Sequence, residues 1–276
     1  MQSTITYRQT AGADQTPPLP QRRRARWSWV GLPLAAVIVL LVWQGVASAG
    51  DYAAFILPSP WLVAQRLAQE LTAGYATGSL LWHTWATLVA ALGGFGLALV
   101  VSLVLGYVLS KTPLLERALT PLLAATQAVP VVAVAPLIIL WVGADGRAKL
   151  LVAALVTFFP ILSSTIIALR TVPRELREMA QISGANRRQL LWNVELPLAL
   201  PVLFGGVKAG LALATTGAVV GEFVAGRAGL GALINIARGL FDTPLIFVAL
   251  LALAALTLAF YAAASTLERA LVRWEA

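Results

Sequence analysis

The chain has 276 residues, of which 59% are hydrophobic and 12% are charged, and its mean hydropathy is +0.82. A soluble domain usually has about 45–50% apolar and about 25% charged residues, so this composition excludes a protein whose main solvent is water. The formal net charge of +8 lies in short segments between apolar runs, which fits a membrane protein better than a nucleic-acid-binding face, and we expect no nucleic-acid partner.

The amino-terminal region is predicted to be a cytoplasmic tail followed by a first membrane span. Residues 1–29 are mostly polar and are expected to be disordered. Val30–Ala49 is apolar over about 20 residues, enough to cross a bilayer core of roughly 30 Å. The basic stretch Arg22–Arg26 and the small residues Ala47-Ser48-Ala49 also resemble a signal peptide, whose apolar region has about 7–15 residues. The greater length here favours a retained span and a membrane domain over residues 30–276.

The connection after the first span contains a predicted surface helix. Within Trp61–Leu71, apolar residues recur at helical spacing opposite Gln65, Arg66, Gln69 and Glu70. This pattern is typical of an amphipathic helix lying on the membrane surface. It serves either simple membrane anchorage or the docking of a partner.

Five further apolar stretches follow, so the sequence predicts an all-α transmembrane fold with six helices. They cover His83–Leu109, Thr120–Val142, Lys149–Leu169, Val202–Val224 and Pro244–Thr266. With both termini in the cytoplasm, 15 of the 20 basic residues face inward, and the outer ones are Arg66, Arg147, Lys149, Arg227 and Arg238. An inward excess of Lys and Arg is the usual orientation rule, so we expect a multi-pass protein of the cell membrane, surrounded by lipid.

Prolines interrupt the third and fourth predicted spans. Pro130 and Pro136 lie in the third span and Pro160 in the fourth. Each removes a helix hydrogen bond, and kinked spans often line cavities where the freed carbonyl groups find water or neighbouring helices. Pro130 and Pro136 are therefore candidates for the lining of a translocation pathway, and the alternative is that they only shape the packing.

The inward connection over residues 170–200 is apolar for a solvated loop. Glu175–Ser183 and Asn186–Asn193 have helical composition and are separated by Gly184, and Pro197 and Pro201 are expected to turn the chain into the fifth span. Two short helices standing off the membrane with apolar side chains exposed imply a partner that covers them. Such a knob either couples a partner to the spans or serves assembly alone.

The fifth predicted span carries four glycines on one helical face. Gly206, Gly210, Gly217 and Gly221 form two small-xxx-small pairs, which allow close approach of another backbone. The other backbone belongs either to the same subunit or to a second copy, at a dimer seam beside the pathway. Glu222 follows them near the outer end, where it either lines the pathway or reaches water.

Two further ionisable residues are predicted to lie at the membrane interfaces. Lys208, near the inner end of the fifth span, is expected to extend its amine to the membrane surface. His83 opens the second span and is expected to be interfacial.

The inward connection resembles a known motif. Glu178-Met179-Ala180, then Gly184 six residues after the glutamate, then Val194-Glu195-Leu196-Pro197 match the spacing of the "EAA" loop of ATP-binding-cassette (ABC) importer permeases. In that pattern Glu-Ala-Ala precedes a glycine, and an aliphatic residue, any residue, Leu and Pro follow. Met179 departs from the usual first alanine, which bears on tight packing at that position alone.

Other segments resemble one group within this family, the nitrate, sulfonate and taurine permeases. These are Leu57-Pro58-Ser59-Pro60, Ala135-Pro136-Leu137, Phe158-Phe159-Pro160 and Gly229-Leu230-Gly231. The segments 172–176 and 217–224 are more similar to permeases for vitamin-related heterocycles, namely the thiamine pyrimidine precursor or riboflavin. Both substrate classes stay open.

The resemblance implies a six-helix permease of the type I ABC importers, acting as a homodimer with two ABC ATPase subunits and an extracytoplasmic substrate-binding protein. The connection 170–200 would then hold the coupling helix, which inserts into the ATPase. Glu178 would pair with a basic residue there, Ala180 would allow close approach, and Gly184 would supply the bend. Leu196 and Pro197 complete the coupling motif.

The sequence contains no candidate catalytic machinery. It has no cysteine and one histidine, which excludes thiolate and histidine-cluster metal sites. It also lacks a Gly-x-x-x-x-Gly-Lys-Ser/Thr phosphate-binding loop, so we expect no enzyme and no cofactor in this chain, with ATP used by the partner. A stand-alone secondary transporter is the competing class, but it would more often show inverted repeats and acidic residues at midspan.

Overall fold

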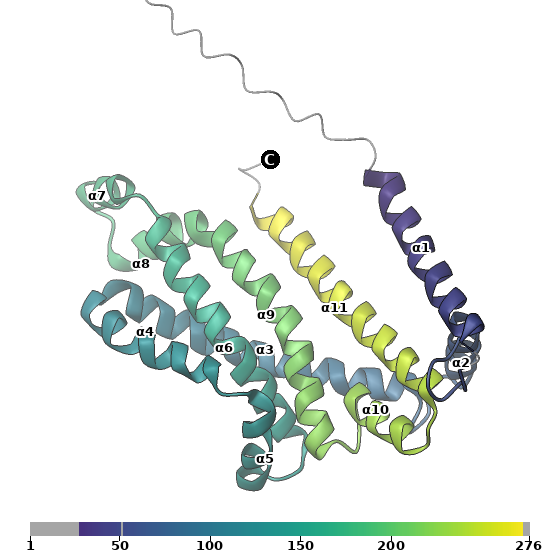
Figure 1. Ribbon diagram of the computed structural model, residues 1–276. Helices are drawn as coiled ribbons and strands as arrows, with labels where there is room; N and C mark the ends of the chain where they lie inside the picture. Colours follow the sequence, from purple (N-terminus) through teal and green to yellow (C-terminus); the bar gives the residue numbers. More distant parts are fainter. Residues whose placement is uncertain (1–27, 51, 273–276) are drawn as a thin grey trace, which may run out of the picture. The chain divides into compact units, whose positions relative to one another are not determined.

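The computed structural model describes residues 28–50 and 52–272, and every regular element in this part of the chain is a helix, as expected (Figure 1). The predicted tail 1–29 lies almost entirely outside the described residues. The helices are α1 (Ser28–Ala49), α2 (Pro60–Thr72), α3 (Leu80–Lys111), α4 (Pro113–Ala128), α5 (Val131–Val142), α6 (Gly146–Thr171), α7 (Arg174–Ile182), α8 (Arg187–Leu190), the π-helix η1 (Leu191–Glu195), α9 (Leu196–Ala225), α10 (Leu230–Gly239) and α11 (Thr243–Leu271).

The chain divides into two compact units, Met1–Val46 and Ala47–Ala276, which are described separately. All but the last three residues of the apolar helix α1 belong to the first unit, and the helix contains Pro33 near its beginning. Its apolar part, Pro33–Ala49, belongs to the class of helices with 10–17 residues, which are short for a span. All the other helices belong to the second unit.

The predicted count of six spans is only partly confirmed. Within the described residues, four helices are long and apolar enough to cross a membrane: α3, α6, the continuous helix Arg187–Val224, and α11. A fifth span is formed if α4 and α5 are counted together, although they are bent by 95° at the break between them. The third predicted span, Thr120–Val142, is therefore broken, because Pro130 has no N–H and ends the helical hydrogen bonding.

Four helices that begin on the predicted outer side have a side-chain cap. The hydroxyl groups of Ser59 and Ser79 and the carboxylates of Asp145 and Asp242 accept hydrogen bonds from backbone N–H groups in the first turns of α2, α3, α6 and α11. Such caps satisfy N–H groups that have no partner within the helix, and so define where these helices start. The predicted surface helix Trp61–Leu71 is confirmed as α2.

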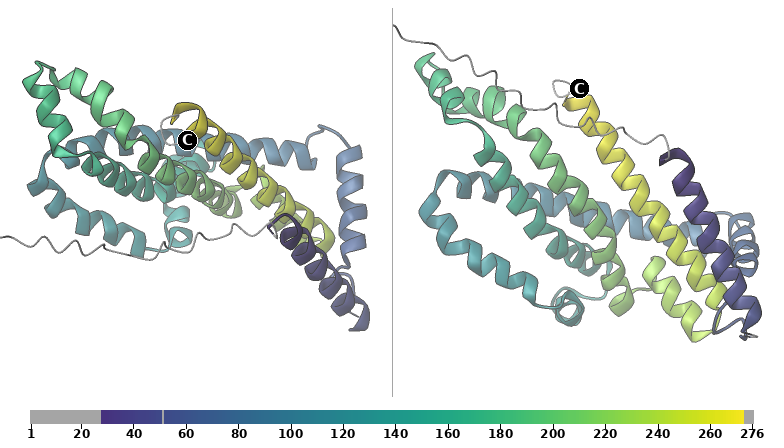
Figure 2. Two further views of the ribbon diagram at one scale, coloured as in Figure 1. Left: turned by 90° about the horizontal axis from the view of Figure 1, so that it is seen from above. Right: turned by 45° about the horizontal axis from the view of Figure 1, so that its top comes forward.

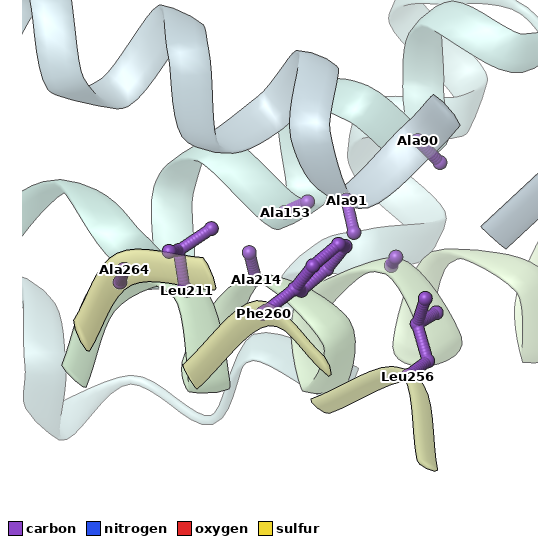
Figure 3. Close-up of a cluster of buried hydrophobic side chains, with 9 residues drawn as sticks. Ala90, Ala91, Ala153, Leu211, Ala214, Leu256, Phe260 and Ala264 are labelled. Carbon is purple, nitrogen blue, oxygen red and sulfur yellow. The ribbon is translucent and has the colours of Figure 1, made fainter. Parts of the chain in front are cut away.

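The centre of the second unit is the pair α6 and α9, which run side by side, with α3 crossing them and α11 lying along α9 (Figures 1 and 2). One core cluster joins all four helices through small side chains, among them Ala91, Ala153 and Ala214, packed around Phe260 (Figure 3). Without a hydrophobic force between apolar helices in lipid, close packing of small residues is a main source of helix association. This packing fixes the four helices relative to one another.

Candidate functional site

The predicted knob is present as α7, and Gly184 ends it as expected. Gly184 has a φ of +84°, a left-handed conformation that glycine adopts without strain. Its N–H donates to the Gln181 carbonyl, and the N–H of Ala185 donates to the Ala180 carbonyl, both at 3.0 Å. These two bonds form a Schellman motif, which satisfies the carbonyl groups at the helix end and reverses the chain.

The solvent-exposed face of α7 is available to a partner. No residue of this described helix is buried within the chain, and Met179 and Ile182 have exposed fractions of 60% and 88%. Glu178 is exposed beside them, whereas Ala180 is half-buried. A charged residue next to exposed apolar side chains on a short rigid helix is an arrangement suited to a docking surface.

The prediction that Pro197 and Pro201 turn the chain into the next span is wrong. The chain runs as one helix from Arg187 to Val224, with the π-helical segment η1 directly before Leu196. The Leu196 N–H donates to the carbonyl of Leu191, five residues back. A proline ring clashes with the carbonyl four residues before it in a regular α-helix, and a wide π-helical turn there is a means of continuing the helix past Pro197.

Next to α7 lies an ionic cluster around a buried carboxylate, which sequence reasoning missed. The side chain of Glu195 is 1% exposed, and its Oε1 contacts the Nζ of Lys111 and lies 3.0 Å from the Nε of Arg177. Arg177 also donates from its guanidinium to the Leu169 carbonyl at the inner end of α6. The one available signal in the sequence for this cluster was Glu195 itself, an acidic residue at the start of an apolar span. It occupies a position where the motif allows any residue.

The break between α4 and α5 is open within the described chain. Pro130 caps α5, Pro136 lies inside it, and both are exposed. No residue of α4 is buried, although the helix carries apolar side chains such as Leu114 and Leu122. Gln127, three residues before Pro130, is also exposed.

The four glycines of α9 face α6 within the same chain. A Cβ added at Gly217 would lie 2.7 Å from the Cα of Ala153, and one added at Gly221 would lie 2.9 Å from the Cα of Lys149. A Cβ added at Gly206 or Gly210 would lie similarly close to side-chain atoms of α6. The structure therefore agrees with packing inside one subunit, the first of the two alternatives, and we do not assign Gly210, Gly217 and Gly221 to a dimer seam.

At the outer end, Glu222 is fully buried rather than in contact with water. Its carboxylate accepts a hydrogen bond from the hydroxyl group of Thr87 and another from the N–H of Gly231, each at 2.8 Å. The oxygen of Thr87 in turn accepts the N–H of Leu230 at 2.7 Å. Glu222 thus joins α3, α9 and the start of α10, and its partners lie inside the chain.

Two more groups extend this buried polar network. His83 was expected at the interface, but it is 2% exposed, and its Nδ1 lies 2.8 Å from the carbonyl oxygen of Gly229. Lys149, on α6, donates from its Nζ to the Ala228 carbonyl. These contacts attach the connection between α9 and α10 to α3 and α6. They also give hydrogen-bond partners to backbone groups of the connection that would otherwise be buried without any.

Lys208 pairs with Glu268 at 2.7 Å, and so connects α9 to α11 instead of extending freely to the surface. Among the described residues, no group of three or more acidic or histidine side chains has the arrangement of a metal site. Three features of the described residues are candidates for function: the exposed helix α7, the ionic cluster next to it, and the open break between α4 and α5.

Comparisons with known proteins show the family of the chain. The family model described as "Binding-protein-dependent transport system inner membrane component" matches residues 98–275. The riboflavin transport system permease protein RibX of Chloroflexus aurantiacus is 64% identical over 262 residues, covering 95% of this chain and 96% of its own length.

More distant relatives carry other substrate names. The formylaminopyrimidine transport permease protein ThiX of Halalkalibacterium halodurans is 31% identical, covering 86% of this chain and 93% of its own. The putative aliphatic sulfonates transport permease protein SsuC of Bacillus subtilis is 32% identical, covering 91% and 90%.

A solved structure of the MetNI methionine ABC transporter, in an inward-facing conformation, has the same fold as much of the chain. It aligns with a TM-score of 0.62 at 20% identity and covers 68% of this chain and 94% of that one. The family implies an ATPase and a binding protein as partners. Its model covers well over half of the chain, so this multi-pass membrane protein belongs to the binding-protein-dependent inner membrane components of ABC transporters.

Proposed function

We propose that this chain is the permease subunit of an importer for riboflavin, driven by a separate ATPase. The observation that carries the proposal is the 64% identity to a riboflavin permease over 95% of the chain. The exposed face of α7 supports an ATPase partner, because Met179 and Ile182 need a surface that covers them. The thiamine pyrimidine precursor is the second candidate substrate, and the similarity to ThiX favours it.

The broken span supports a pathway beside α4 and α5. Lipid cannot satisfy freed backbone groups, so irregular backbone at membrane depth occurs where it is buried in protein or lines a water-filled cavity. The break before Pro130 is not buried within the described chain, and it lies within the apolar stretch Thr120–Val142. We therefore assign Pro130 and Pro136 to the lining of the pathway, facing a second copy of the chain.

The charge of this lining favours a neutral substrate. Between Arg117 and Asp145 the sequence contains no charged residue, and the exposed polar side chains near the break include Thr126 and Gln127. A pathway for nitrate or a sulfonate would be expected to present a cationic group, since such anions are costly to desolvate. An uncharged amide can instead form hydrogen bonds with the ring edge of a heterocycle.

The rest of the assembly follows the family. In this proposal two copies of the chain form a homodimer in the cell membrane, two ATPase subunits bind the coupling loop 170–200 inside, and the binding protein delivers substrate outside. Both termini are cytoplasmic, with a tail over residues 1–29 before the membrane domain 30–276. Glu178 pairs with a basic residue of the ATPase, while Ala180, Gly184, Leu196 and Pro197 shape the docking loop. The chain itself is not an enzyme and carries no cofactor, because the partner hydrolyses ATP.

The test is transport by the complete complex in proteoliposomes. Permease, ATPase and binding protein together are expected to accumulate riboflavin when ATP is supplied on the ATPase side, and taurine or nitrate in excess should not compete. Riboflavin uptake by the permease alone, without a nucleotide-hydrolysing partner, would refute the importer class. ATP-dependent uptake of a sulfonate in place of riboflavin would refute only the substrate.

A further inference from the structure

Arg177 makes polar contacts between the helix α7 and the spans. Its neighbours along the chain, α8 and η1, provide its main packing contacts, and no residue of this described helix is buried. Arg177 reaches from α7 to the carbonyl group of Leu169 on α6 and to the carboxylate of Glu195 on η1. A displacement of α7 by a partner therefore changes the contacts of Arg177 with α6 and with the inner end of the helix that contains η1 and α9.

Glu195 joins three parts of the chain at one oxygen atom. Its Oε1 contacts Lys111, the last residue of α3, as well as Arg177 of α7, and Glu195 itself continues directly into α9. A carboxylate that is 1% exposed is costly to leave unpaired, so separation of either cation is opposed. The cluster of Lys111, Arg177 and Glu195 thus ties α3, α7 and α9 together.

The two faces of α7 have different contacts. Successive residues of an α-helix turn by about 100°, so Met179 lies on nearly the opposite face from Arg177, and Ile182 lies close to Met179. The apolar face is open to a partner, whereas the face of Arg177 is in contact with the spans. Because α7 is short and rigid, a displacement of its exposed face also displaces the face that carries Arg177.

The segment next to Glu195 is suited to a change in shape. Single-turn π-helices inside α-helices occur frequently at functional sites, and η1 ends at Glu195. A shift between π-helical and α-helical hydrogen bonding would rotate Glu195 relative to α9. Packed elements of this kind have discrete arrangements, not continuous ones.

We propose that Glu195, held between Lys111 and Arg177, is the positioning residue that transmits movement of α7 to α3 and α9. This inference rests on the proposed function, in which α7 docks on the ATPase. The partner exerts force on the face of Met179 and Ile182, and the cluster converts that force into movement of the spans. Glu195 does not touch substrate or ATP.

The experiment compares uptake and ATP hydrolysis in the same proteoliposomes containing the complete complex. Glu195→Gln keeps the size of the side chain and removes the charge that holds both cations. The variant is expected to assemble with the ATPase and to hydrolyse ATP, while uptake per ATP falls at least tenfold. An unchanged ratio of uptake to ATP hydrolysis would overturn the inference, and so would a parallel fall of both with loss of ATPase binding.

The matched control is Glu268→Gln, which breaks the ion pair with Lys208 between α9 and α11. This variant should keep the wild-type ratio. Arg177→Gln, which changes a partly exposed side chain of α7, is expected to reproduce the Glu195→Gln defect and serves in its place if that variant does not accumulate. The double variant is expected to lose no more uptake per ATP than the more severe single variant, because both substitutions remove the same contact between Glu195 and Arg177. Additive losses would contradict a shared role.

The wild-type complex separates this inference from the function on which it rests. If the wild type fails to couple uptake to ATP hydrolysis, the proposed function is wrong. If the wild type couples and the Glu195 and Arg177 variants do so equally well, only the role of the cluster is wrong.

Discussion

Gly184 has a backbone conformation that favours glycine, in open surroundings. Its φ is +84°, and an added Cβ would meet nothing within 4 Å. Gly184→Leu is therefore expected to act through backbone strain of about 1–2 kcal/mol, which opens the Schellman turn and misplaces α7. We expect normal amounts of the variant in the membrane but no substrate-stimulated ATP hydrolysis by the reconstituted complex.

The matched control for this prediction is Gly78→Leu. Gly78 has a φ of +88° and equally open surroundings, but it lies in the outer connection before α3. It should carry the same strain and retain stimulated hydrolysis. Wild-type stimulation in Gly184→Leu, or equal loss in both variants, would contradict a specific role for the bend.

Glu222 is expected to support the structure of the outer end. Glu222→Leu removes the acceptor for Thr87 and for the N–H of Gly231, both buried, and is expected to destabilise the protein by about 2–6 kcal/mol, because each donor left without a partner costs about 1–3 kcal/mol. In a protein of this size the midpoint of thermal unfolding in detergent should fall by roughly 10 °C. Asp145→Ala, which removes an exposed helix cap, should cost about 1 kcal/mol, and equal midpoints for the two variants would argue against the network.

Residue by residue, the sequence was informative where chain geometry alone decides the outcome. Gly184 could be predicted because a glycine between two helical segments is a local signal. The contacts of Glu195 with Lys111 and of Glu222 with Thr87 could not, because these partners lie more than eighty residues away along the chain and meet only after the helices pack. For the same reason His83, at the first turn of a span, was expected at the interface although its contact with Gly229 buries it.

At the scale of elements, the packing of α9 on α6 depends on the glycine face. Gly217→Ala would place a Cβ 2.7 Å from the Cα of Ala153, so the two helices must separate, at a cost of about 1–3 kcal/mol. Gly205, on the same helix, has nothing within 4 Å, and Gly205→Ala should stabilise the helix by about 0.5–1 kcal/mol. Thermal unfolding in detergent should therefore shift in opposite directions, and a lower midpoint for Gly205→Ala than for Gly217→Ala would contradict this packing.

Most of the helices could be predicted from apolar length, but their breaks and joins could not. The long apolar stretches correspond to α3, α6 and α11, because length and composition suffice for a helix in lipid. Prolines were ambiguous: Pro130 ends a helix, whereas Pro136, Pro160 and Pro201 lie inside helices. Whether a proline breaks a helix depends on whether neighbouring groups donate hydrogen bonds to the carbonyl that the proline leaves free, and these neighbours are known only from the fold.

On the scale of the whole molecule, sequence motifs indicated the family, and the fold explains how its parts are arranged. The docking helix α7 and the ionic cluster lie at the inner ends of α3, α6 and α9, while the buried network of Glu222 holds their outer ends. In the proposed function, the same three helices connect the side where ATP is used to the side where substrate arrives. The open break before Pro130 lies beside them, and its role can be tested directly.

The chain contains no cysteine, so single cysteines report the environment of chosen positions. Val129 at the break is 48% exposed, and Leu258 in the middle of α11 is 69% exposed. If the break lines an aqueous pathway, Val129→Cys in the assembled complex should react with a membrane-impermeant thiol reagent, because only thiolate in water reacts readily. Leu258→Cys, facing lipid, should stay unreacted although its side chain is more exposed in the isolated chain. Bound riboflavin should slow the reaction at Val129→Cys several-fold, and equal reactivity of the two cysteines would place the pathway elsewhere.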